Sequence, residues 1–382
     1  MYCLRGWMLT IMVSSGEMQY DATIAYLKGV AILLMVLAHC SQSVIYCYTV
    51  YMFHMALFFI VSGFCLKEKY IEAPFLFVWK RITGLWWPFV KWCLIFLFFH
   101  NLFHDIGIYS DTIGYLGNGV HKYSSPETFE RAKNIVFRME GIEPLLGGFW
   151  FIRSLFYGSV FAFMTILVLR KGFAYFKLER EWIPVIGGGV FLLFSLLTSV
   201  RHNTLTVFHF SSNTFLASAF FCMGYILVSH RARKFPIWII MIVLITMVIS
   251  APYIGIAIAD SFYEPSHILP YYFEASAIVW SLYSFPWWKL NKSFLRVLEY
   301  IGNNTLPILT WHFLSFKLVT LLIIEYYGLC NDRMAEFPVI YEYANQGWFV
   351  AYFIVGVAIP ILINSAFCRI WLYIKNCLCI TQ

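Results

Sequence analysis

Two ionisable side chains in one apolar stretch carry the clearest chemical signal in the sequence. Lys28 and His39 lie near the two ends of the run from Ala22 to Cys40, which is long and apolar enough to cross a bilayer. On an α-helix eleven residues are about three turns, so the two side chains lie within roughly 20° of one face and about 16 Å apart along the axis. The spacing predicts a helix that presents a cation and a titratable imidazole along one stripe.

Ionisable groups inside a membrane span are costly and usually face the bundle interior or a water-filled cavity, so a functional role is the first hypothesis. A histidine is suited to act as a general base, and a lysine to contact an anion or a developing oxyanion. Two structural explanations stay open. Lys28 can snorkel to the membrane surface as an anchor, and His39 can be a core histidine whose ring a backbone carbonyl satisfies.

The composition places the whole chain in a membrane. Of its 382 residues 61% are hydrophobic, 20% are aromatic and only 12% are charged, with a mean hydropathy of +0.72, which is too apolar for a soluble domain of this length. The ten cysteines are scattered without a CxxC spacing, so we interpret them as small apolar side chains and expect no metal site. The net charge of +7 has a topological explanation, and we expect no nucleic-acid partner.

Apolar runs of about twenty residues predict an all-α, polytopic integral membrane bundle of about ten transmembrane helices. We expect a single domain over 21–382 and a short cytoplasmic segment over 1–20, with Met18 as an alternative start and a cleaved signal peptide as another explanation. The expected spans are 22–41, 49–66, 84–103, 149–169, 183–200, 212–229, 235–256, 269–285, 305–325 and 347–372.

The distribution of basic residues predicts the orientation of the bundle. The loops after the second, fourth, sixth and eighth spans hold most of them, so by the positive-inside rule both termini are cytoplasmic. Lys28 then lies toward the cytoplasm, and His39 lies deeper or toward the outside. The basic residues of these loops are Lys67, Lys69, Lys80, Arg81, Arg170, Lys171, Lys177, Arg180, Arg231, Arg233, Lys234, Lys289, Lys292 and Arg296.

A polar loop over 104–148 is the long excursion on the outer side. Its stretch "PETFERAKNIVFRME" predicts a short surface helix that begins near Pro126. The loop is a candidate lid or acceptor-binding element, and a passive connector is the alternative. Just beyond it, Arg153 stands in an apolar run and needs a partner or water, for which Glu143 is one candidate.

Two motifs together resemble the acyltransferase-3 family of integral membrane acyltransferases. The stretches "LKGVAILLMVLAH" and "FHMALFFIVSGF" are similar to that family's basic residue, ten residues and histidine, followed by an apolar FF-x-x-SGF helix. Lys28 departs from the usual arginine, and with "FHMALFF" it looks more like the fucose 4-O-acetylase-like branch. The resemblance is strongest over 21–90 and returns at 149–157 and 301–314.

This resemblance implies an O-acyltransferase that moves acetyl from cytoplasmic acetyl-CoA to a hydroxyl of a cell-surface polysaccharide or its lipid-linked precursor, in a bacterial inner membrane. It implies that His39 is the base and Lys28 a positive charge of the catalytic site. Lys28 and Arg81 are then candidate contacts of the acetyl-CoA phosphates, although Arg81 can instead contact lipid head groups. Gly84 stands where relatives often have a second arginine.

Three further ionisable residues in apolar runs are candidate substrate contacts: His54, Arg153 and His312. A satisfied core histidine is the alternative at His312. Small and amide side chains nearby are expected to be structural, through close helix packing or helix capping: Ser62, Gly63, Asn303 and Asn304.

A membrane transporter or flippase is the competing class of function. The buried cations and histidines, Lys28, His39, Arg153 and His312, would then line a substrate or proton path. The sequence shows no paired half-helix repeats, which disfavours many secondary-transporter folds. An acyltransferase for a small metabolite or with another acyl donor is a third hypothesis that differs only in substrate.

Overall fold

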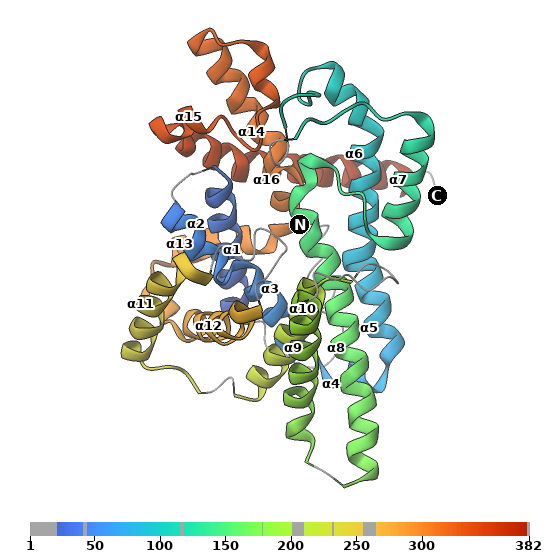
Figure 1. The fold of residues 1–382 in the computed structure, drawn as a ribbon, viewed down its shortest axis with the longest axis vertical. Helices are drawn as coiled ribbons and strands as arrows, with labels where there is room; N and C mark the ends of the chain where they lie inside the picture. The colour runs from blue at the N-terminus through green and yellow to red at the C-terminus, as the bar shows by residue number, and fades with distance from the viewer. Residues whose placement is uncertain are drawn as a thin grey trace.

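The computed structural model describes residues 21–40, 44–114, 118–177, 179–200, 210–230, 233–254 and 265–379. Helices and connecting turns make up these residues, with no β-strand among them (Figure 1). The expectations for residues 1–20, including Met18 as a start, lie outside the described part of the chain. The all-α membrane bundle predicted from the apolar runs is confirmed.

The longer helices follow the expected spans closely. In chain order the α-helices are α1 (Ala22–Cys40), α2 (Val44–Tyr51), α3 (His54–Phe64), α4 (Glu68–Glu72), α5 (Pro74–Arg81), α6 (Trp87–Asp105), α7 (Ser125–Arg138), α8 (Trp150–Tyr175), α9 (Ile183–Val200), α10 (Ser212–Ser229), α11 (Ile237–Ile254), α12 (Pro265–Ser284), α13 (Lys292–Asn303), α14 (Thr305–Tyr327), α15 (Tyr341–Tyr343) and α16 (Phe349–Cys379). Within the described ranges, eight helical stretches are long and apolar enough to cross a membrane, built on α1, α5 with α6, α8, α9, α10, α11, α14 and α16.

The two other expected spans form helices, but these are not both long enough and apolar enough to count as membrane-spanning. The run 49–66 is broken at Met52 and Phe53, where Phe53 leaves the helical conformation with φ −146°. Neither proline nor glycine marks this break in the sequence. α12 has 20 residues but is more polar, with Glu274 among several hydroxyl side chains.

α13 lies where the sequence predicts only a basic loop. Asn291 caps its first turn, because the Asn291 side chain accepts a hydrogen bond from the Ser293 backbone N–H at 2.8 Å. Leu295 and Leu298 are buried, and the helix packs against α1. A search for apolar runs of twenty residues misses such a helix, because it has 12 residues and is amphipathic.

α10 is the central helix and α11 a peripheral one. α10 packs against α3, α8 and α9, and 67% of its span is buried, whereas only 17% of the α11 span is buried. The outward face of α11 carries large apolar side chains such as Trp238, Ile242 and Ile245. Such a face belongs against lipid rather than water.

Two glycines allow the helices α3 and α10 to approach closely. A Cβ at Gly63 of α3 would overlap the Phe221 carbonyl of α10, and one at Gly224 of α10 would overlap the Ile60 carbonyl of α3. Small residues permit such contacts between membrane helices. The packing role expected for Gly63 is confirmed.

Contacts between helix ends gather the basic loops on one side of the bundle. Arg170 of α8 donates two hydrogen bonds to the Glu68 carboxylate of α4, at 2.8 and 2.7 Å, and Tyr225 of α10 bonds to both. Tyr283 of α12 donates to Asp21 beside the start of α1, at 3.1 Å. We call this end of the bundle the basic side. The continuous helix of α5 and α6 begins there and carries the chain to the opposite side.

The Glu68 contact predicts a small, pH-dependent contribution to stability. Hydrogen bonds from Arg170 hold the pKa of Glu68 below its usual range, so the contribution is present above the unfolded-state pKa and is lost as pH falls through the folded one. The Glu68 side chain is 66% exposed. We therefore expect Glu68→Gln to lower the free energy of unfolding by only about 0.2–1 kcal/mol near neutral pH. Thermal unfolding in detergent measures this, and an equal loss under acidic conditions would contradict it.

Candidate active site

One face of α1 connects the parts of the candidate site. Lys28, Ile32, Met35 and His39 are spaced four, three and four residues apart, which keeps them on one side of a helix. Lys28 lines a cavity near the basic side, and Ile32 and Met35 line a second cavity. His39 lies one turn beyond Met35. The stripe predicted from the spacing therefore follows two cavities.

The first cavity is cationic. It encloses about 860 Å³, including the part that opens to solvent, and three basic side chains line it: Lys28, Lys80 and Arg81. None of its described lining residues is an aspartate or glutamate. Positive charges brought together in a partly buried site whose described lining holds no carboxylate favour an anionic ligand. We call this space the cationic cavity.

Two neighbours of the cationic cavity strengthen this interpretation. The Arg81 guanidinium lies 4.7 Å from the centre of the Phe77 ring, a cation–π contact that holds the side chain without neutralising it. The Ser62 hydroxyl, which also lines the cavity, has no hydrogen-bond partner among the described residues. An unsatisfied hydroxyl beside three cations suits a ligand that carries acceptor oxygens.

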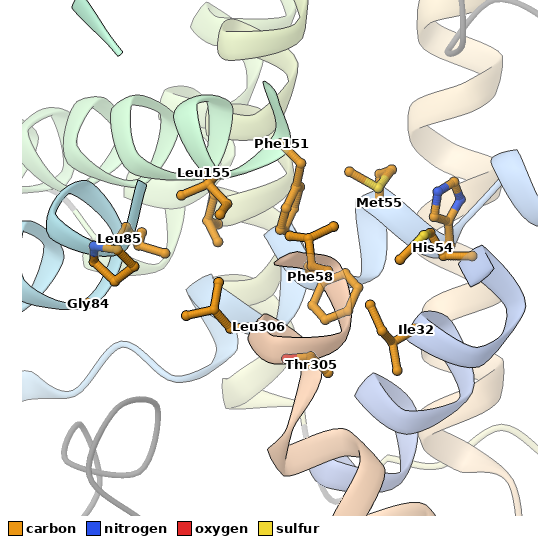
Figure 2. Close-up of a pocket in the computed structure, with 14 residues that line it drawn as sticks. Ile32, His54, Met55, Phe58, Gly84, Leu85, Phe151, Leu155, Thr305 and Leu306 are labelled. Carbon is orange, nitrogen blue, oxygen red and sulfur yellow. The ribbon is translucent and has the colours of Figure 1, made fainter. Parts of the chain in front are cut away.

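The second cavity is apolar and has a single ionisable side chain in its lining, His54. It measures about 560 Å³, again including open space, and its walls come from α1, α3, α6, α8 and α14 and from the turn between α5 and α6. Figure 2 shows His54 at one end of this space and Gly84 with Leu85 at the other, with Phe58 and Phe151 between them. We call it the apolar cavity.

The two cavities adjoin at a neck. Phe58, Gly84, Leu85 and Leu155 line both of them. Gly84 and Leu85 belong to a π-helical turn, Ile82–Trp86, that joins α5 to α6. Such turns occur often at functional sites, because they shift the side chains that follow out of the regular helical register.

Two histidines beyond the apolar cavity lie face to face. The rings of His39 and His312 are stacked, with centroids 5.6 Å apart, and Phe313 contacts the His39 ring edge-on at 4.9 Å. α1 supplies His39, and α14 supplies the other two. The candidate residues His39 and His312, which are far apart in the sequence, are thus brought together.

Backbone hydrogen bonds fix the tautomers of His312 and His54. His312 donates from Nδ1 to the carbonyl oxygens of Ile308 at 3.0 Å and Leu309 at 3.1 Å. His54 donates from Nδ1 to the Val50 carbonyl at 2.8 Å, across the break between α2 and α3. Because a carbonyl oxygen only accepts, Nδ1 carries the hydrogen in both rings and Nε2 keeps its lone pair. The buried Nε2 of His312 has no hydrogen-bond partner among the described residues.

Arg153 lies outside the linings of both cavities. Its guanidinium donates to the Glu140 carboxylate at 3.0 Å and to the Arg138 carbonyl at 3.2 Å, which ties α8 to the end of α7. The suggested partner Glu143 was wrong: its carboxylate accepts instead from the His100 ring of α6 at 2.6 Å. Glu140 and Glu143 are three residues apart in an irregular turn, so sequence spacing does not distinguish them.

The helix expected near Pro126 is confirmed as α7, whose first turn is capped by Ser124. The cap expected from Asn304 is not formed. Asn304 stands at the start of α14, but its side chain donates to the Tyr300 carbonyl at 2.8 Å and accepts from Asn364 of α16 at 3.1 Å. The asparagine therefore joins α13, α14 and α16.

Lys317 is an ionisable residue of the ninth span that the sequence analysis missed. It is 4% exposed and donates to the carbonyl oxygens of Met334 at 2.8 Å and Glu336 at 2.7 Å. Phe337, next in the chain, packs against Phe313, which contacts His39. A lysine inside an apolar run was the available signal, and its contacts indicate that it positions the segment behind the histidine pair.

Comparisons with known proteins agree with the motifs. The sequence model of the acyltransferase-3 family, described as an acyltransferase domain, matches residues 21–365. The nodulation protein NolL of Sinorhizobium fredii (strain NBRC 101917 / NGR234) is 27% identical over 227 residues, which cover 56% of this chain and 50% of that protein. The match thus spans half of the relative's length, and no solved structure matches the chain. Since the family match covers most of its length, the chain belongs to the acyltransferase-3 family of membrane acyltransferases.

Proposed function

We propose that the protein transfers an acetyl group from acetyl-CoA to a hydroxyl of a cell-surface glycan or its lipid-linked precursor, in a bacterial inner membrane. The observation that carries this proposal is the sequence of spaces along α1. A cationic cavity and an apolar cavity share the residues of the neck, and the α1 face that lines both continues one turn further to His39, which lines neither. This order suits a donor with charged phosphates at one end and a thioester at the other.

The donor enters from the basic side, which corresponds to the cytoplasm by the positive-inside rule. Its phosphates contact Lys28 and Arg81 in the cationic cavity, whose described lining holds no carboxylate. The pantetheine arm then extends past the neck. Lys28 and His39 are about 16 Å apart along the helix axis, which is compatible with an extended arm.

His39 acts as the general base. It removes the proton from the acceptor hydroxyl as the hydroxyl oxygen attacks the thioester carbonyl, the bond between carbon and sulfur breaks, and the imidazolium returns the proton to the departing thiolate. The stacked His312 ring and Phe313 fix the orientation of His39. The apolar walls limit water access and so limit hydrolysis of the thioester.

The test is transfer of radiolabelled acetyl from acetyl-CoA into the glycan fraction of membranes that contain the protein. We expect label in the glycan with the protein present and none in membranes that lack it. A protein that transfers no acetyl, yet moves a labelled glycan precursor across the bilayer, would be a transporter and would end the proposal.

The donor site predicts a specific loss of affinity in Lys28→Ala. A hydrogen bond to a charged group contributes roughly 1.5–3 kcal/mol, so we expect the Kd for acetyl-CoA to rise by about tenfold or more. Isothermal titration with purified protein in detergent measures this. Lys171→Ala is the matched control, because Lys171 is an exposed cation near the basic end of α8 and lines neither cavity. Equal affinities of the two variants would contradict the phosphate role.

A further inference from the structure

Gly84 occupies the neck between the two cavities and touches nothing there. It lines both cavities, and apart from its chain neighbours and the backbone of its own helix, no atom lies within 4 Å of a Cβ built at this position. The space at its α-carbon is therefore open. Any side chain at position 84 would begin where the linings of the cationic and apolar cavities meet.

Neither packing nor backbone conformation accounts for a glycine here. The glycines of the close helix contacts, such as Gly63 and Gly224, have a neighbouring backbone where their Cβ would be, and Gly84 has none. The turn Ile82–Trp86 keeps helical φ and ψ angles that any residue adopts. Glycine also weakens a helix relative to alanine. What its lack of a side chain provides is the width of the neck.

The other walls of the neck are large and fixed. Phe58 and Leu155 come from α3 and α8, and Leu85 is buried beside Gly84. The Trp86 indole N–H donates to the Val136 carbonyl of α7 at 3.2 Å, which anchors the turn to a second helix. The turn is thus anchored to a second helix, and a larger side chain at position 84 would begin where the linings of the two cavities meet.

We propose that Gly84 determines which acyl donors reach the histidines, by setting the width of the neck through which the acyl-thioester end of the donor passes. This inference rests on the proposed function, because it assumes an acyl-CoA donor. It assigns the phosphates and the acyl end to different cavities. A substitution at Gly84 should therefore affect the two ends of the donor differently.

The test compares Gly84→Ala and Gly84→Leu with wild type, using two probes. Adenosine 3′,5′-bisphosphate carries the donor's nucleoside and two of its three phosphates without the pantetheine arm, and acetyl-CoA is the whole donor. We expect bisphosphate binding to be unchanged, while Gly84→Leu raises the Kd for acetyl-CoA and lowers acetyl transfer by at least about tenfold. Gly84→Ala, which narrows the neck less, should retain more acetyl transfer than Gly84→Leu.

Gly189→Leu is the matched control. Gly189 lies on the exposed face of α9, lines neither cavity, and also has no atom within 4 Å of an added Cβ. Wild-type binding and transfer by Gly84→Leu would overturn the inference and leave the proposed function intact. Wild-type protein that binds neither probe would overturn both. Equal losses for both probes would show that the substitution damages the cationic cavity, which contradicts the assignment of the acyl end to the neck.

Discussion

His39→Ala is expected to reduce acetyl transfer by about 10²- to 10⁴-fold, the usual contribution of a positioned general base. His39 ends the α1 stripe and stacks on His312, so its ring is held in one orientation by packing. The cationic cavity lies three helical turns away, around Lys28. Removing the imidazole should therefore lower kcat and leave the Kd for acetyl-CoA near its wild-type value.

Single-turnover transfer at saturating acetyl-CoA, at matched amounts of protein in the membrane, measures the effect. His230→Ala is the control, since His230 is exposed at the end of α10 and lines neither cavity. A wild-type kcat in His39→Ala would exclude His39 as the base.

A second variant distinguishes the role of His39 from that of His54, the other imidazole near the proposed donor path. His54 holds the Val50 carbonyl with its Nδ1 hydrogen and lines the apolar cavity with the rest of its ring. In His54→Asn the amide replaces the Nδ1 donor and the Nε2 lone pair is removed. If transfer survives in this variant and fails in His39→Ala, the base is His39. The reverse result would assign the base to His54.

Hydropathy was enough to predict most of the fold. In lipid, a helix pairs its backbone polar groups internally and needs a long run of apolar side chains, and both requirements are visible in the sequence. The spans built on α1, α8 and α10 follow directly from these requirements. The break before His54 does not, since no proline or glycine marks Met52 and Phe53, and the chain conformation there depends on tertiary packing. The sequence analysis missed α13 for a different reason. Its amphipathic pattern is short, and its apolar side is covered only when the helix packs against α1.

The site was predictable where it lies on one helix. The spacing of Lys28 and His39 determines their common face whatever surrounds α1. The partners could not be predicted, because contacts between helices depend on how the bundle assembles. The predicted partner of Arg153 was therefore the wrong carboxylate, and the contact between His39 and His312 was not predicted. Gly84 was noted only for the arginine it replaces, since the neck exists only once α3, α8 and the turn Ile82–Trp86 come together.

Gly224→Ala is expected to cause one of the larger losses of stability among single methyl additions in the described bundle core. The new Cβ would overlap the Ile60 carbonyl, and Gly63 on α3 meets α10 in the same manner at the Phe221 carbonyl. Both obstructing atoms are backbone atoms, so no side chain can rotate away and the two helices must separate. Overpacking of a core costs about 1–3 kcal/mol and occasionally more, and we expect the upper end of that range here.

Thermal unfolding in detergent, followed by size-exclusion chromatography, measures the loss, with Gly189→Ala as the control because its Cβ meets open space. A midpoint for Gly224→Ala equal to that of the control would refute the close contact. The double variant Gly63→Ala with Gly224→Ala is more informative still. Once the first methyl group has separated α3 from α10, the second finds space already made, so the two losses should sum to more than the loss in the double variant. Simple additivity would mean that the two glycines do not share one helix contact.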